Sequence, residues 1–118
     1  MRDPIRVARL RIHDMLDNIE HVRTATSSLT FDDYVKQRIL QLAVERAIGI
    51  ISEASRHIPD DLKATVPEIP WSKIAGIGNV LRHDYRDVAP RAIWNILMTD
   101  LGPLEAALRK MLIRIGED

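Results

Sequence analysis

Apolar residues that recur every three or four positions are the feature that most constrains how this chain can fold. Between residues 30 and 58 they form two stripes, which predicts a helix whose apolar surface is too wide for one neighbour. Such a helix is either central in a bundle or meets another subunit with its second stripe. The first stripe consists of Leu40, Val44, Ala47, Ile51, Ala54 and Ile58, and the second of Val35, Ile39, Leu42 and Ile50.

Three further segments have the same helical spacing. One begins near Pro4 and fades in the polar stretch 24–30, and another begins at or just after Pro70. The last runs over residues 90–115 and contains Pro103, which lacks a backbone donor and predicts a kink. We therefore expect four long helices.

Two local signals add detail to this prediction. Thr30 and Asp33 have the spacing of a capping box, so the second helix is expected to begin at Thr30. The proline-rich stretch 59–70 predicts a loop with one short turn at residues 60–63. Aromatic residues make up only 4% of the chain, which disfavours sheets. The prediction is an all-α, antiparallel, up-and-down four-helix bundle that forms a single domain over residues 1–118.

Charge and composition limit the functions open to this chain. Seventeen basic residues balance seventeen acidic ones, so no net field draws the chain to nucleic acid or to an anionic membrane. Cysteine is absent, no apolar run is long enough to span a membrane, and the first residues do not resemble a signal peptide. We expect a cytoplasmic protein. His13, His21 and His57 lack metal-ligand spacing, so no metal and no cofactor are expected.

One polar cluster, in the stretch GIGNVLRHDYRD over residues 76–87, differs from the otherwise ordinary helical sequence. Helical geometry places Asn79, Arg82, His83 and Arg86 within one arc, with Tyr85 at its edge. The glycines of this stretch, at positions 76 and 78, and a third at position 49 in the second helix predict close approaches of neighbouring backbones.

The side chains of this cluster suit metal-free RNA cleavage. A histidine can take a proton from a ribose 2′-hydroxyl or give one to a leaving oxygen. An arginine can hold the phosphate and stabilise its developing charge, and an asparagine can orient either group. The alternative is that Arg82, His83 and Arg86 form a solvated helix face while Tyr85 packs in the core.

Three stretches of the chain resemble the HepT-like family of the HEPN superfamily. They are RILQLAVERAIGIISEASRHIP, PEIPWSKIAGIGNVLRHDY and IWNILMTDLGPLEAAL, which together cover most of residues 30–108. The resemblance implies a helical bundle that dimerises with its active clefts at the subunit interface. It also implies a ribonuclease toxin, an RNA substrate, and a minimal nucleotidyltransferase as antitoxin that places AMP on the motif tyrosine.

The family motif consists of an arginine, four to six residues, a histidine, one residue and a tyrosine. His83 and Tyr85 match its second half, and Asn79 matches an asparagine that commonly follows the arginine. The motif spacing allows the arginine at positions 76, 77 or 78, none of which is an arginine, and the resemblance points to Gly78, which offers no side chain to a phosphate. Arg82 lies one turn further along, about 40° around the helix, and is the candidate to replace it.

The leading hypothesis is therefore a HepT-like ribonuclease toxin. In it, His83 is the general acid and base, Arg82 binds the phosphate, Asn79 orients the pair, and Tyr85 assists in the cleft and accepts the AMP. A second hypothesis, motivated by Gly78, is a catalytically weak or inactive binding subunit for a nucleotidyltransferase. A third is a purely structural interaction bundle, in which His83 and Tyr85 have no function.

Overall fold

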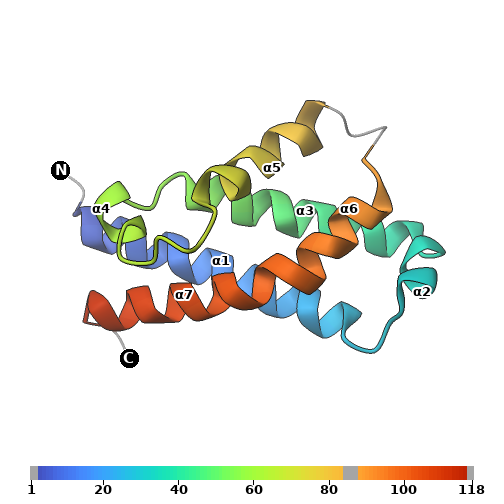
Figure 1. Cartoon of the computed structure of the whole chain (residues 1–118), viewed down its shortest axis with the longest axis horizontal. Helices are drawn as coiled ribbons and strands as arrows, with labels where there is room; N and C mark the ends of the chain where they lie inside the picture. Colours follow the sequence, from blue (N-terminus) through green and yellow to red (C-terminus); the bar gives the residue numbers. More distant parts are fainter. Residues whose placement is uncertain (1–2, 84–87, 117–118) are drawn as a thin grey trace.

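The structure is a computed structural model that describes residues 3–83 and 88–116. Every regular element in these residues is helical, which confirms the all-α prediction. Figure 1 shows the long helices lying along the length of the molecule. In chain order the elements are α1 (Pro4–Thr26), α2 (Phe31–Val35), α3 (Arg38–Ser55), α4 (Asp60–Lys63), α5 (Trp71–His83), α6 (Pro90–Asn95), the π-helix η1 (Ile96–Asp100) and α7 (Leu101–Arg114).

Helix α1 begins where the sequence predicts. Pro4 occupies the first turn, and the side chain of Asp3 accepts a hydrogen bond from the Ile5 amide at 3.0 Å. Its apolar stripe is buried against α3 and α7, and this contact forms much of the core. The buried apolar residues of α1 are Ala8, Ile12, Met15, Leu16, Ile19 and Val22.

The predicted single helix from Thr30 to Ile58 is wrong, because the chain ends α2 at Val35 and begins α3 at Arg38. The capping box at Thr30 is confirmed: its hydroxyl accepts from the Asp33 amide at 3.1 Å, and its own amide donates to the Asp33 carboxylate at 2.9 Å. The break follows from tertiary contacts that helix periodicity does not contain. Tyr34 is fully buried beside Trp94, and its carbonyl accepts a 3.0 Å bond from the side chain of Gln41.

The two apolar stripes of this region have different surroundings. The first packs inward between α1 and α5, where Val44, Ala47, Ile51 and Ala54 are buried. The second faces outward: Val35, Ile39 and Leu42 are exposed by 40%, 79% and 46%, and Ile50 is partly exposed. Within the described residues, therefore, α3 is covered on one side only.

The C-terminal segment departs from α geometry just before Pro103. The five residues Ile96–Asp100 form a π-helix between α6 and α7. Pro103 cannot donate to the carbonyl of Thr99, four residues earlier, and Thr99 lies in this π-turn. The residues just before Pro103 thus form a widened turn, whereas α7 itself continues through Pro103, and the predicted kink stays a prediction. The predicted short turn at residues 60–63 is α4.

None of the helices within the described ranges combines the length and the apolar character needed to cross a membrane.

Candidate active site

Helix α5 carries the candidate site residues and is attached to the rest of the molecule at its start and along its length. The indole N–H of Trp71 donates to the carbonyls of Lys63 and Val66, at 3.2 and 3.3 Å. Further along, the ammonium of Lys73 forms an ion pair with Asp100 in η1 at 2.9 Å. These contacts fix the N-terminal end of α5.

Helices α5 and α3 approach each other closely at Gly78. Its amide donates to the hydroxyl of Ser52 at 2.9 Å, and that hydroxyl donates in turn to the carbonyl of Ala75 at 3.0 Å. A Cβ atom on Gly78 would lie 2.8 Å from the Ser52 oxygen and 3.3 Å from its Cβ atom. Arg56 adds a 2.8 Å hydrogen bond to the same carbonyl of Ala75. The two helices therefore approach this closely because position 78 has no side chain.

The predicted close approach is confirmed at Gly78 and wrong at the other two glycines. A Cβ atom added to Gly76 or to Gly49 would meet no described atom within 4 Å. Sequence reasoning missed Ser52, the residue that makes the contact with Gly78. No signal in the sequence connects two positions 26 residues apart on different helices, and a serine beside an apolar stripe is unremarkable by itself.

The guanidinium of Arg82 reaches back along α5 to lie over Gly78. One of its terminal nitrogens is 3.6 Å from the position that a Cβ atom on residue 78 would take. The other terminal nitrogen donates to the side-chain oxygen of Asn79. The structure thus brings together Gly78, Asn79 and Arg82, three of the positions that the motif comparison singles out.

The other predicted site residues lie apart from this contact or outside the described residues. His83 is the last residue of α5, and its side chain is exposed and does not line the cleft described below. Tyr85 and Arg86 lie outside the described residues. The alternative reading of this helix face as solvated agrees with the exposure of Asn79, Arg82 and His83.

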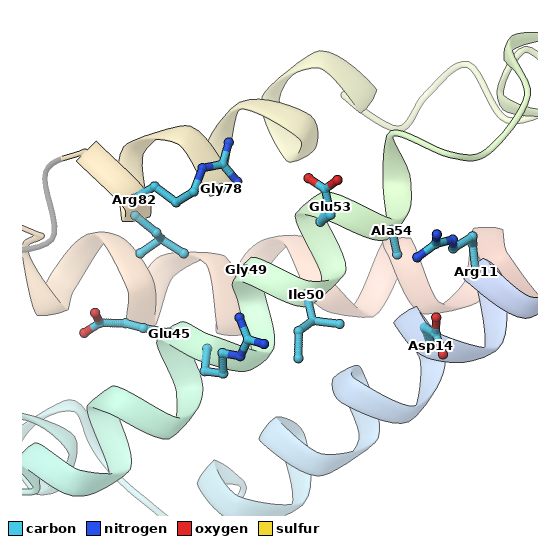
Figure 2. Close-up of a pocket in the computed structure, with 11 residues that line it drawn as sticks. Arg11, Asp14, Glu45, Gly49, Ile50, Glu53, Ala54, Gly78 and Arg82 are labelled. Atoms are coloured by element: carbon cyan, nitrogen blue, oxygen red, sulfur yellow. The ribbon is translucent and has the colours of Figure 1, made fainter.

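A cleft with a volume of about 490 Å³ opens between α1, α3 and α5 beside this arrangement. Figure 2 shows Gly49 on the part of α3 that faces it, Arg82 extended along α5 over Gly78, and Glu53 rising from α3 toward α5. Both signs of charge are present in its walls, so it suits a ligand that has an anionic group and hydrogen-bond donors. The lining residues are Arg11, Asp14, Glu45, Arg46, Gly49, Ile50, Glu53, Ala54, Gly78, Leu81 and Arg82.

The ion pairs around the cleft leave some of its charges open to a ligand. Glu45 pairs with Arg38 at 3.8 Å, and Glu53 pairs with Arg56 at 3.9 Å and with His57 at 3.4 Å. Arg46 forms no ion pair with any residue in the described ranges. Those ranges contain no group of three or more His, Asp or Glu side chains that could hold a metal ion.

The resolved pKa shifts lie away from this cleft. Burial raises the pKa of Tyr34 to about 12, and the nearby charge of Glu45 acts in the same direction. Hydrogen bonds from the backbone and side chain of Thr30 lower the pKa of Asp33. Both shifts belong to the packing and capping of α2.

Comparison with known proteins identifies one family. The family described as "Ribonuclease HepT-like" matches residues 15–111. The chain is 35% identical to "Probable ribonuclease HepT" of Thermococcus cleftensis, over 85% of this chain and 91% of that protein. It is 30% identical to a "Putative RNase" of Methanocaldococcus jannaschii, over 76% of this chain and 83% of that protein. A "Putative RNase" of Caldanaerobacter subterraneus is 28% identical, over 92% of this chain and 96% of that protein. No solved structure matches the chain.

Proposed function

The chain belongs to the ribonuclease HepT-like family, and on this premise we propose that it is a metal-independent RNA endonuclease. It would be the toxin of a toxin–antitoxin pair and act in the cytoplasm. The observation that carries the proposal is the arginine held over Gly78: the guanidinium of Arg82 lies 3.6 Å from the position at which the missing motif side chain would begin.

The reaction follows from the chemistry of two side chains. His83 takes the proton from a ribose 2′-hydroxyl, the 2′-oxygen attacks the neighbouring phosphorus, and the bond from phosphorus to the 5′-oxygen breaks. The leaving 5′-oxygen then receives a proton from the protonated imidazole of His83, and the other product carries a 2′,3′-cyclic phosphate. Arg82 stabilises the extra negative charge on the phosphate oxygens.

Asn79 acts in this proposal through Arg82. Its amide oxygen accepts a hydrogen bond from the guanidinium, which restricts a side chain that otherwise has many rotamers. Asn79 is thus a positioning residue for the phosphate-binding group. Tyr85 would assist in the cleft and accept the AMP that inactivates the enzyme.

The assembly that we propose is a two-fold symmetric dimer of four-helix, up-and-down bundles. The outward stripe of Val35, Ile39 and Leu42 is apolar and uncovered by the described residues, so burying it in a dimer is favourable. The same face of α3 continues into the cleft at Gly49 and Glu53. A second copy on this stripe would therefore border the cleft and bring two site clusters near each other. The other partner is a minimal nucleotidyltransferase antitoxin.

The test of the catalytic assignment is RNA cleavage by purified protein in the presence of a chelator. His83→Ala is expected to lower the cleavage rate by about 10²- to 10⁴-fold, because a general acid and base contributes about that much. Arg82→Gln is expected to lower it by about 10²- to 10³-fold. His21→Ala, an exposed histidine of α1, is the matched control. Equal rates for wild type and His83→Ala would eliminate the assignment.

One observation favours a second candidate, a weak or inactive binding subunit for the nucleotidyltransferase. Position 78 is glycine and faces Ser52, so the family's arginine is absent and cannot be added without disturbing the helix contact. For that reason Gly78→Arg does not separate the two candidates cleanly. Transfer of labelled AMP from the partner to wild type but not to Tyr85→Phe, with no RNA cleavage by either, would favour the second candidate.

A further inference from the structure

Helix α3 contains a glycine for which packing within the described residues gives no reason. Gly49 lies in the middle of the helix, where glycine is less favourable than alanine. A Cβ atom there would meet nothing within 4 Å, and the residue faces the cleft (Figure 2). A helix-interior glycine with open space above it fits a place where a group from outside approaches the backbone closely.

The charged groups around Gly49 suit a nucleotide. Arg46 lies three residues before it on α3, lines the same cleft, and has no ion-pair partner among residues 3–83 and 88–116. Arg82 enters from α5 with its guanidinium over Gly78. Glu53 lies one turn after Gly49, and its carboxylate, which pairs with Arg56 and His57 but is half exposed, points from α3 toward α5 (Figure 2). Two guanidinium groups match a phosphate, and a carboxylate matches the N–H groups of a base.

We infer that this cleft is a nucleotide-binding subsite that holds the nucleotide joined to the scissile phosphate of the RNA substrate. Arg46 and Arg82 contact the phosphate, the sugar and base lie over Gly49, and Glu53 accepts hydrogen bonds from the base. The volume of about 490 Å³ lies within the range of small-ligand sites. The inference rests on the proposed function. It adds which part of the RNA substrate the enzyme recognises.

The carboxylate also gives the subsite a base preference. Guanine presents two adjacent N–H donors, N1–H and the N2 amino group, which one carboxylate can accept together. Uracil presents a single N–H donor between two carbonyl oxygens, and these oxygens repel a carboxylate. The subsite therefore favours guanosine over uridine.

The first experiment blocks the cleft without breaking the fold. Calorimetry measures binding of guanosine 3′-monophosphate to wild type, Gly49→Leu and Gly102→Leu. Both glycines are helical and have no described atom within 4 Å of an added Cβ, but Gly102 does not line the cleft. We expect Gly49→Leu to weaken binding at least tenfold and Gly102→Leu to leave it unchanged. Equal binding by both variants would overturn the inference.

The second experiment tests whether Glu53 recognises the base. Glu53→Gln is expected to weaken binding of guanosine 3′-monophosphate about tenfold, since a bidentate pair to a carboxylate is lost. It should leave the affinity for uridine 3′-monophosphate unchanged or raise it, because the repulsion between the carboxylate and the uracil carbonyl oxygens is removed. The matched control is Glu105→Gln, which removes a carboxylate of α7 outside the cleft. An equal loss for both nucleotides, or none for either, would exclude Glu53 as the base-reading group.

These measurements keep failure of the subsite separate from failure of the proposed function. Binding needs no cleavage, so the two are measured separately on the same preparations of wild type, Gly49→Leu and Gly102→Leu. If Gly49→Leu still cleaves RNA at the wild-type rate, the subsite proposal is wrong and the ribonuclease proposal stands. If wild type binds the nucleotide but cleaves no RNA, the ribonuclease proposal is wrong and the cleft is still a nucleotide-binding site. If Gly49→Leu makes a dimer monomeric and retains nucleotide affinity, the cleft is covered by a second copy and the inference is wrong.

Discussion

The two faces of α3 differ in what surrounds them. On the inner face, Ser52 fills the space that Gly78 leaves, and hydrogen bonds join the two helices there. On the outer face, no described atom fills the space above Gly49, and Ile39 is 79% exposed. The same residue type thus permits helix packing at one position and leaves a cleft at the other. The inner face of α3 contributes to the packing of the folded chain, whereas the outer face is left uncovered by the described residues.

This difference predicts where substitutions change the free energy of unfolding. Changes on the inner face should lower it, because close packing and hydrogen bonds are lost there. Changes on the outer face should affect ligand or subunit binding with little effect on folding.

The largest effect is expected at the helix contact. Gly78→Val should lower the free energy of unfolding by about 3 kcal/mol, the upper part of the range for overpacking, because its Cβ atom would overlap Ser52. Chemical denaturation measures the change. The control is Gly76→Val on the same helix, where an added Cβ atom meets no described atom. Equal destabilisation of the two variants would show that the contact is not tight.

The next effect comes from Tyr34, which lies against the start of α3 and is fully buried. Its pKa in the folded state is about 12, above the ordinary value of 10. The unfolded chain therefore loses this proton first, so stability is retained below pH 10 and falls between about pH 10 and pH 12. The loss should reach about 2 to 3 kcal/mol. Chemical denaturation across this pH range should show the loss of stability in wild type and no such loss in Tyr34→Phe. Identical pH profiles for the two proteins would contradict the prediction.

Ser52→Ala tests the hydrogen bonds of the inner face. The variant loses the hydroxyl that accepts from Gly78 and donates to Ala75, which should cost about 1 to 2 kcal/mol. Ser27→Ala, an exposed serine at the end of α1, should change stability by less than about 0.5 kcal/mol. If the two variants denature alike, the buried hydroxyl does not hold α5 on α3.

Gly49→Ala should have the opposite sign. Alanine is favoured over glycine in a helix interior, and the added methyl group meets no described atom, so stability should rise by about 1 kcal/mol. Thermal denaturation measures the gain. A loss of stability would mean that another part of the folded molecule occupies the space above this residue.

The smallest effect on folding is expected at the outward stripe. Ile39→Glu should change stability by less than about 0.5 kcal/mol, because this side chain is 79% exposed. Sedimentation should nevertheless show a shift from dimer to monomer, since a charge in the proposed interface opposes association. Ile113→Glu, also exposed at 69% but on α7, should leave the dimer intact. A dimer that tolerates Ile39→Glu does not use this stripe.

Much of the fold could be predicted because it depends on local sequence. The three- to four-residue spacing predicted the helical segments, Pro4 marked the start of α1, and the pair Thr30 and Asp33 marked the start of the short helix α2. The break at residues 36 and 37 could not be predicted, because the contacts of Tyr34 with Trp94 and Gln41 join residues that helix periodicity does not relate. Local rules fail where such contacts replace helical hydrogen bonds.

The candidate site was predictable only in part. Spacing along one helix placed Asn79 and Arg82 on the same face, and they are hydrogen bonded. It could not show that Arg82 folds back over Gly78, because a long side chain has many rotamers and its neighbours select one. Nor could it show which glycine packs against another helix, since Gly49 and Gly78 look alike in sequence.

By itself, the sequence determined the helical class, the starts of α1 and α2 and the family of this protein, because these depend on residue spacing and on motifs along one chain. The packing of helices against each other determined which apolar stripe is buried and that Ser52 contacts Gly78. It also opened the cleft beside Arg82. These features arise between segments distant in sequence. Their stability depends on atomic contacts between helices, which the spacing of apolar residues along one chain does not specify.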